Sequence, residues 1–279
     1  MKMTRILTPM ALAVSTAVVS VAASAGPSGY APPPPAAPPA VYKAGTVMLR
    51  LGASWVDPDD DSGRWRYNRD LFPEFEGLGY KIDNDTGWNF SVGFMPIDHF
   101  SIELGYIGKT EHDVDWTGLL QPVFPAVGPE FEPLPGKLRV GSVDRQTGTL
   151  FFNWFPVCKE SWIQPYVGLG AIYTDFDNLR FRTTANDYLS DLNEVLTGPA
   201  TMYFEDDWGW GAQFGVDIMF GRDSNWLVNL AGQYHDVDTV TDLHYAFPRE
   251  LEPGSFVRAA RRDLDLDAWV WNLGIGYKF

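Results

Sequence analysis

The chain has 279 residues, of which 15% are aromatic and 27 are glycine, and its formal net charge at pH 7 is −15. So acidic a chain excludes nucleic acid as a partner, because phosphate recognition requires clustered Lys and Arg side chains. Cys158 is the only cysteine, which excludes an intramolecular disulfide and suits a short turn.

Residues 1–25 are predicted to be a cleaved secretory signal peptide. Lys2 and Arg5 precede a mostly apolar stretch over 6–21, and the small residues of 23–25 (Ala-Ser-Ala) form the cleavage site. An uncleaved membrane anchor is the alternative, and Pro9, Ser15 and Thr16 inside the stretch disfavour it. Beyond the leader no run of 18 apolar residues follows, so a helical membrane span is not expected there.

Residues 26–41 are predicted to form a Pro-rich periplasmic spacer. Four consecutive prolines over 32–35 and two more at 38 and 39 enforce extended polyproline II geometry and leave almost nothing to bury. A ligand for a proline-binding partner is the alternative, which nothing else in the segment supports.

From residue 42 onward, apolar residues alternate with small or polar residues in eight separate segments, the pattern of strands with two different faces. The segments are 47–55, 88–94, 100–106, 143–155, 167–174, 208–218, 226–234 and 269–279. One face of nearly every segment is wholly apolar and rich in Trp and Phe, whereas the other is Gly, Ser, Asn, Gln or a charge. The fourth segment is the least regular, because Phe151 interrupts its polar face.

The connections between these segments alternate strictly between short and long. The short ones are 96–99, 156–161 and 221–225, and the long, acidic, proline-bearing ones are 57–85, 112–142, 176–206 and 236–263. This alternation, with both ends of the chain on the short side, is typical of bacterial outer-membrane barrels. The prediction is an all-β fold: an eight-stranded antiparallel transmembrane β-barrel over residues 42–279, with short periplasmic turns and four long extracellular loops, in the outer membrane of a Gram-negative cell.

A soluble β-sandwich or lipocalin-like barrel is the alternative, but those folds place apolar residues inside and polar residues outside. Here the polar face suits a narrow lumen, and tryptophans near strand ends suit aromatic girdles at the bilayer interfaces. These tryptophans are Trp55, Trp88, Trp208, Trp226 and Trp269.

The final residues, WNLGIGYKF, end the chain on an apolar alternation and a terminal aromatic, Phe279. An exposed strand edge of this kind invites aggregation in a soluble protein, whereas a barrel closes it against its first strand. The pattern also resembles the recognition signal of the outer-membrane assembly machinery, which becomes an expected partner.

Several of these segments together resemble the OmpW family of outer-membrane proteins, which includes the AlkL-type hydrocarbon porins. The similar segments are KAGTVMLRLGASWVDP, QPYVGLGAIYTDFDN, YLSDLNE, DDWGWGAQFGVDI, NWLVNLAGQYHDVDT and DLDAWVWNLGIGYKF. The resemblance implies a short helix at residues 189–192 beside the barrel mouth. It also implies a hydrophobic channel in the extracellular half, through which small apolar molecules pass and leave sideways into the membrane, with no cofactor and no reaction.

The sequence departs from the family where bulky apolar side chains narrow the lumen. Gly105 and Gln233 stand at the matching inward positions, with Ile107 and Leu227 nearby, which predicts a smaller or more polar constriction. Apolar residues within the second long loop, over 119–131, either rebuild an apolar vestibule or pack among themselves, and both readings stay open.

Five further residues are predicted to face the lumen, where charges in a narrow barrel usually pair with one another. They are Arg50, Glu103, Arg145, Gln213 and Asp217.

The sequence predicts neither a metal site nor a catalytic site. The acidic run 57–61 fails the EF-hand pattern at its glycine and at its twelfth position, and the four histidines have no metal-ligand spacing. No strand pairs a His with a Ser on the lipid-facing side, so a lipid-modifying enzyme is disfavoured. The alternative to a channel is a structural or interaction barrel whose acidic loops bind lipopolysaccharide, a host surface or phage.

Overall fold

The computed structural model describes residues 39–59, 79–117, 137–177, 179–192, 200–221, 223–246 and 256–279. The predicted signal peptide, nearly all of the Pro-rich spacer and the apolar residues of 119–131 therefore lie outside the described residues. Within the ranges just given, none of the helices has the length and apolarity needed to cross a membrane.

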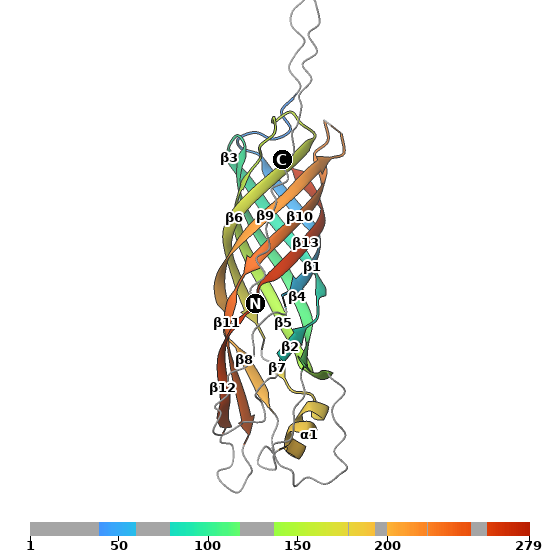
Figure 1. Cartoon of the computed structure of the whole chain (residues 1–279). Helices are drawn as coiled ribbons and strands as arrows, with labels where there is room; N and C mark the ends of the chain where they lie inside the picture. Colours follow the sequence, from blue (N-terminus) through green and yellow to red (C-terminus); the bar gives the residue numbers. More distant parts are fainter. Residues whose placement is uncertain are drawn as a thin grey trace, which may run out of the picture. The chain divides into compact units, whose positions relative to one another are not determined.

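Eight antiparallel strands form a closed barrel (Figure 1). They are β1 (Val47–Pro58), β3 (Asp85–Ile97), β4 (Phe100–Thr117), β5 (Lys137–Trp154), β6 (Ile163–Phe176), β9 (Asp207–Met219), β10 (Trp226–Asp236) and β13 (Ala268–Lys278). The barrel closes where the first strand pairs with the last, from Met48 opposite Lys278 to Pro58 opposite Ala268. The predicted strand number, orientation and closure are confirmed.

Three short connections and the C-terminus lie at one end of the barrel, here called the turn end, and the long connections leave the other, here called the loop end (Figure 1). Cys158 is exposed in one of the short turns. At the loop end lie β2 (Gly79–Ile82), which pairs with β4, and the helix α1 (Thr183–Leu192), which contains the predicted helical residues 189–192. A second, four-stranded sheet there consists of β7 (Leu179–Arg180), β8 (Thr201–Phe204), β11 (Asp238–Ala246) and β12 (Phe256–Asp265).

The prediction that the long connections are loops throughout is therefore wrong in part. Strands β4 and β5 continue to Thr117 and back from Lys137, well inside the segment 112–142. The extensions contain buried apolar residues, Val114 and Val140, which alternate with charged ones. Charge pairing also supports them, since Arg139 on β5 lies 2.6 Å from Asp113 and 3.3 Å from Asp115 on β4.

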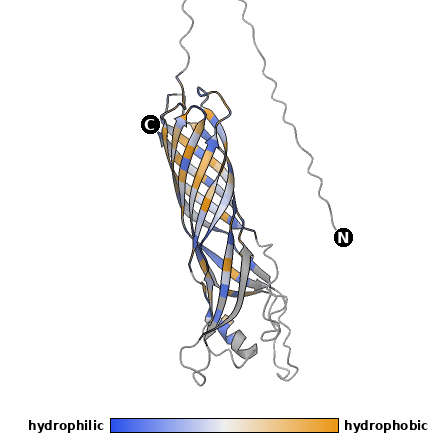
Figure 2. Cartoon of the chain, turned by 90° about the vertical axis from the view of Figure 1, so that its left-hand side faces the viewer, coloured by the Kyte–Doolittle hydropathy of each residue, from blue (hydrophilic) through white to orange (hydrophobic). Residues whose placement is uncertain are grey.

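The barrel is inverted relative to a soluble protein, because its large apolar side chains are exposed on the outside. Hydrophobic and hydrophilic residues alternate along its strands (Figure 2). Leu51 and Leu104 are 62% and 61% exposed, whereas the neighbouring Arg50 and Glu103 are buried in the interior. All five predicted girdle tryptophans are exposed. An outer surface of this kind is stable only in contact with hydrocarbon.

Phe151, which interrupts the polar face in the sequence, points inward and is fully buried. It pairs with Gly170 on β6, and a Cβ atom at residue 170 would lie 2.8 Å from the Phe151 ring. Because residue 170 on β6 is a glycine, the Phe151 ring on β5 has room to point into the lumen.

Candidate functional site

The turn end of the lumen is closed by nine buried apolar residues, here called the basal cluster. They are Val41, Tyr42, Met48, Met95, Phe155, Tyr166, Met219, Leu227 and Ala231. Leu227, predicted from the sequence to lie near the constriction, belongs to this cluster and is fully buried.

Tyr42 enters the barrel from the segment that precedes β1. Its backbone N–H donates to the carbonyl oxygen of Lys159 (3.1 Å), and its ring packs edge-on against Phe155 with centroids 5.3 Å apart. The phenol donates a hydrogen bond of 2.6 Å to Asp217 Oδ2. The start of the barrel domain thus blocks its own turn end with an aromatic ring anchored at three points.

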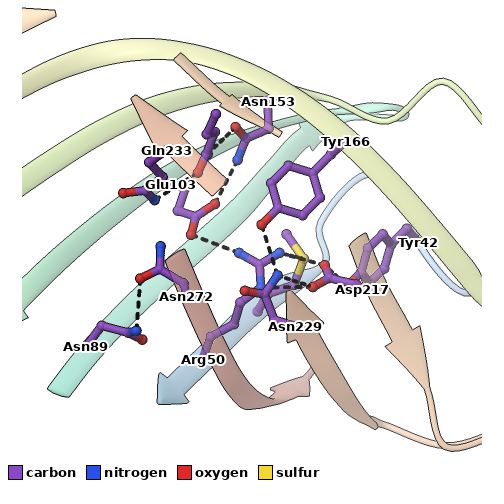
Figure 3. A network of polar contacts seen from close by, with 12 residues as sticks. Tyr42, Arg50, Asn89, Glu103, Asn153, Tyr166, Asp217, Asn229, Gln233 and Asn272 are labelled. Atoms are coloured by element: carbon purple, nitrogen blue, oxygen red, sulfur yellow. Dashed lines mark hydrogen bonds and ion pairs between the residues drawn. The ribbon is translucent and has the colours of Figure 1, made fainter. Parts of the chain in front are cut away.

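Above the basal cluster, Arg50 lies between two carboxylates (Figure 3). Its Nη1 is 2.9 Å from Glu103 Oε1 and its Nη2 is 2.6 Å from Asp217 Oδ2. All three side chains are at most 8% exposed. Asn229 donates a further bond of 2.8 Å to Asp217 Oδ1. Buried charges are tolerated only when they are paired and hydrogen-bonded in this way.

Hydrogen bonds extend this network toward the loop end. Asn153 Nδ2 donates to Glu103 Oε2 (2.7 Å), and Asn153 Oδ1 accepts from Gln213 Nε2 (2.5 Å). Gln233 Nε2 donates to Gln213 Oε1 (3.0 Å), and Gln233 Oε1 lies 3.0 Å from Nε2 of His235. The polar network, as these contacts are called below, therefore runs from Tyr42 to His235 without interruption.

The polar network nearly fills the middle of the lumen. The cavity beside it has a volume of about 30 Å³, room for a water molecule or two, and is bounded by Arg50, Glu103, Gly105, Ile107 and Gln233 among others. Gly105 is tightly surrounded, because a Cβ atom there would lie 2.5 Å from Thr149 Oγ1. No wide aqueous passage runs through this part of the described barrel.

Nearer the loop end, the lumen has two unlike sides, together called the upper layer. One side is an apolar cluster of Val56, Ile107, Ala268 and Val270 on β1, β4 and β13. The other side is polar and comes from β5, β6 and β10, with Arg145, Thr147, Thr174 and His235 all buried. The two sides adjoin, because Ile107 pairs with Thr147 and Ala268 pairs with His235.

Arg145 differs from Arg50 in its partners. Its Nε donates to Thr147 Oγ1 at 3.3 Å and its guanidinium lies 5.9 Å from the centroid of the Phe176 ring. Within the described part of the chain, no carboxylate pairs with it, and its Nη2 has no hydrogen-bond partner. The expectation that lumen charges pair holds for Arg50, Glu103 and Asp217, whereas Arg145 has no carboxylate partner among the residues that the structure describes.

On the lipid-facing side, a groove of about 510 Å³ lies over β9, β10 and β13. Phe214, Trp271 and Leu273 form its sides, and Gly232 leaves its floor without a side chain. Ala231 and Asn272 border both this groove and the small inner cavity, so only the backbone layer separates inside from outside at that point.

The structure brings together most of the residues predicted to face the lumen. Arg50, Glu103, Gln213, Asp217 and Gln233 belong to the polar network, Gly105 and Ile107 border the cavity, and Arg145 lies in the upper layer. Leu227 lies apart, at the turn end.

Sequence reasoning missed other lumen residues, chiefly Tyr42, Asn153, Tyr166 and Asn229. The alternation of β5, β6 and β10 carries the signal for the last three, which occupy inward positions. No periodic signal marks Tyr42, because it precedes the first strand.

A closed antiparallel barrel with an apolar exterior, aromatic residues near both ends and a polar interior defines an integral outer-membrane β-barrel. This chain belongs to the OmpW family, whose family model matches residues 43–279. The protein is accordingly located in the outer membrane, in contact with the lipid bilayer.

Relatives and a solved structure agree with this assignment. Outer membrane protein W of Salmonella typhi is 26% identical over 85% of this chain and 90% of its own length. Outer membrane protein W of Vibrio cholerae is 23% identical over 87% of this chain and 93% of its own. The crystal structure of the outer membrane protein OprG from Pseudomonas aeruginosa matches with a TM-score of 0.65 and 27% identity, covering 85% of this chain and 97% of that one.

Proposed function

We propose that this barrel is a passive channel through which small hydrophobic molecules cross the lipopolysaccharide layer. The observation that carries the proposal is the buried apolar cluster of Val56, Ile107, Ala268 and Val270, which lies inside the barrel on the loop-end side of the polar network. Transfer from water to apolar side chains lowers the free energy of an apolar solute. The same transfer does not lower the free energy of a polar solute.

The same geometry favours a sideways exit. Between the apolar cluster and the turn end, the polar network and the basal cluster block the lumen. An apolar solute could pass only by separating a buried ion pair, which would cost several kcal/mol because the charges would be left buried without partners. The groove that adjoins Ala231 and Asn272 marks where a solute would reach the bilayer. Because β10 and β13 are paired there, Ala231 opposite Asn272, exit requires this ladder to open locally.

The proposed channel needs no cofactor and no energy source, and it carries out no reaction. Its further partners are lipopolysaccharide around the acidic loop end and the assembly machinery, which would recognise the exposed terminal Phe279. The alternative is an interaction barrel whose loops bind lipopolysaccharide, a host surface or phage.

Uptake of a labelled medium-chain alkane by cells with an intact outer membrane, with and without this protein, tests the proposal. Ala268→Trp and Val56→Phe each add bulk to the apolar cluster and should slow the uptake to the level of cells without the protein. The control is Gly148→Leu, because residue 148 lies opposite Tyr106 on the outer face and a Cβ atom there meets nothing within 4 Å.

Folding of each variant is checked by the heat-dependent shift of its electrophoretic mobility. Uptake that is the same with and without the protein would overturn the channel and favour the interaction barrel. Uptake that is faster with the protein but insensitive to both bulky variants would place the route outside the upper layer.

A further inference from the structure

The groove over β9, β10 and β13 is large enough to hold part of a ligand. Its volume of about 510 Å³ falls in the range of roughly 300–1,000 Å³ that is typical of ligand sites in proteins. Its shape depends on Gly232, which lies between Phe214 on β9 and Trp271 on β13. A Cβ atom at residue 232 would lie 2.6 Å from Phe214 and 2.9 Å from Trp271, so the two rings approach β10 this closely only because the residue between them is a glycine.

Aromatic rings and branched aliphatic side chains form the sides of the groove. Phe214 and Trp271 pack edge-on with ring centroids 5.9 Å apart, and both side chains remain nearly half exposed. Leu230 and Leu273 pair with each other on β10 and β13 and are 44% and 58% exposed. Because these four side chains are accessible in the structure, their surfaces are free to contact a ligand.

The polarity of the groove indicates what kind of ligand fits. Among the described residues that line it, Asn272 alone is polar, and its side-chain oxygen accepts hydrogen bonds from Ser54 and Asn89 inside the barrel. A polar ligand would lose its hydrogen bonds with water on entering the groove and gain few in return. The groove therefore suits a hydrocarbon chain.

The bilayer is the source of such a chain. The groove opens on the same outer surface as the exposed Leu51 and Leu104, which is the surface in contact with lipid. A lipid chain against a convex part of the wall touches protein on one side, whereas a chain in the groove touches it on several. Dispersion attraction grows with the number of atoms in contact, so a chain in the groove is held more tightly than its neighbours.

Aromatic rings lead from the groove toward the loop end. Trp271 stacks on Trp269 with centroids 6.0 Å apart, and the Trp269 ring lies 5.4 Å from that of Tyr234. The Tyr234 hydroxyl donates a hydrogen bond to Asp267, which directly precedes β13. Tyrosine and tryptophan are typical of the membrane–water interface, where one part of the ring is apolar and another is polar. A lipid whose headgroup lies at the loop end therefore has an apolar path for its chain along these rings.

We infer that the groove is a binding site for a linear acyl chain of a bilayer lipid in the leaflet at the loop end, with Phe214 and Trp271 as the residues that hold the chain. The bound lipid stays with the barrel while the surrounding lipids exchange. Binding there requires no passage through the lumen, so alkane uptake that is the same with and without the protein would leave this inference untouched.

Native mass spectrometry of the barrel released from nanodiscs of dipalmitoyl phosphatidylcholine tests the site by counting the lipids that remain bound. The unaltered protein should retain one lipid after the others have dissociated. Gly232→Leu places a side chain in the groove and Phe214→Ala removes one of its sides, so both variants should lose the retained lipid.

Gly148→Leu is the matched control, because it adds the same side chain to the outer face at a position where a Cβ atom meets nothing within 4 Å. It should retain the lipid as the unaltered protein does. Folding of every variant is checked by the heat-dependent shift of its electrophoretic mobility. Phe214→Ala keeps the test decisive if Gly232→Leu does not fold.

Nanodiscs of dipalmitoyl phosphatidylglycerol keep the acyl chains and change the charge of the headgroup. Retention should be the same with either lipid, because the groove contacts only the chain. Retention that depends on the headgroup, or that survives in folded Gly232→Leu or Phe214→Ala, would overturn the inference, as would the absence of a retained lipid. A dimer of the unaltered protein that Gly232→Leu dissociates would also overturn it, because a second copy of the chain would then fill the groove.

Discussion

Replacing Arg50 by methionine should destabilise the barrel more than any other single substitution in the lumen. The guanidinium is 2.9 Å from Glu103 and 2.6 Å from Asp217, and all three groups are nearly inaccessible to water. Methionine fills a similar volume but leaves two buried carboxylates without a cation. Breaking a buried ion pair by removing one partner costs about 3–5 kcal/mol.

The remaining partners of the carboxylates place the expected loss at the lower end of that range. Asp217 keeps hydrogen bonds from Tyr42 and Asn229, and Glu103 keeps one from Asn153. These donors still stabilise the negative charges in part. A loss of about 3 kcal/mol lowers the folding equilibrium constant by roughly two orders of magnitude.

Reversible urea unfolding in phospholipid vesicles measures this loss, with fluorescence of the 11 tryptophans as the signal. The triple variant Arg50→Met/Glu103→Gln/Asp217→Asn removes all three charges and should recover most of the lost stability. A loss below about 1 kcal/mol for Arg50→Met, or a triple variant no more stable than the single one, would refute the role assigned to charge compensation.

Two further predictions concern the turn end and the barrel wall. The Ala44 N–H, 2.7 Å from Asp98, and then Lys159, 3.0 Å away, lower the pKa of the Asp98 carboxyl below its ordinary value of 3.8. These contacts stabilise the folded protein fully above the ordinary pKa of the carboxyl, and the stabilisation is lost as pH falls through the lowered pKa. The unaltered protein should therefore have a larger free energy of unfolding than Asp98→Asn at pH 6, and the difference should vanish in strong acid. Gly52→Ala should lower the free energy of unfolding in urea by about 1–3 kcal/mol, because the new Cβ atom would lie 2.1 Å from a backbone oxygen of β13. Gly148→Ala is the control, since a Cβ atom there meets nothing within 4 Å and should change the free energy of unfolding by less than about 0.5 kcal/mol. Equal effects of the two substitutions would contradict the packing argument.

The barrel could be predicted from the sequence because a bilayer imposes a simple rule on every strand. Within the hydrocarbon region, outward residues are apolar and inward residues are small or polar, so Leu51 and Arg50 identify the two faces without knowledge of their neighbours. The extensions of β4 and β5 lie beyond the predicted segments, although the buried Val114 and Val140 within them alternate with charged residues. Their stability comes from cross-strand pairs such as Arg139 with Asp113, which depend on register.

The layers of the lumen were less predictable for the same reason. Tyr42 and Asp217 are 175 positions apart, and only closure of the barrel brings them together. Arg50 and Arg145 both occupy inward positions on their own strands. The residues next to each arginine in the sequence do not indicate which one has carboxylate partners. The difference arises because strands β4 and β9 present carboxylates at the level of Arg50, whereas the residues paired with Arg145 are Thr110 on β4 and Phe176 on β6.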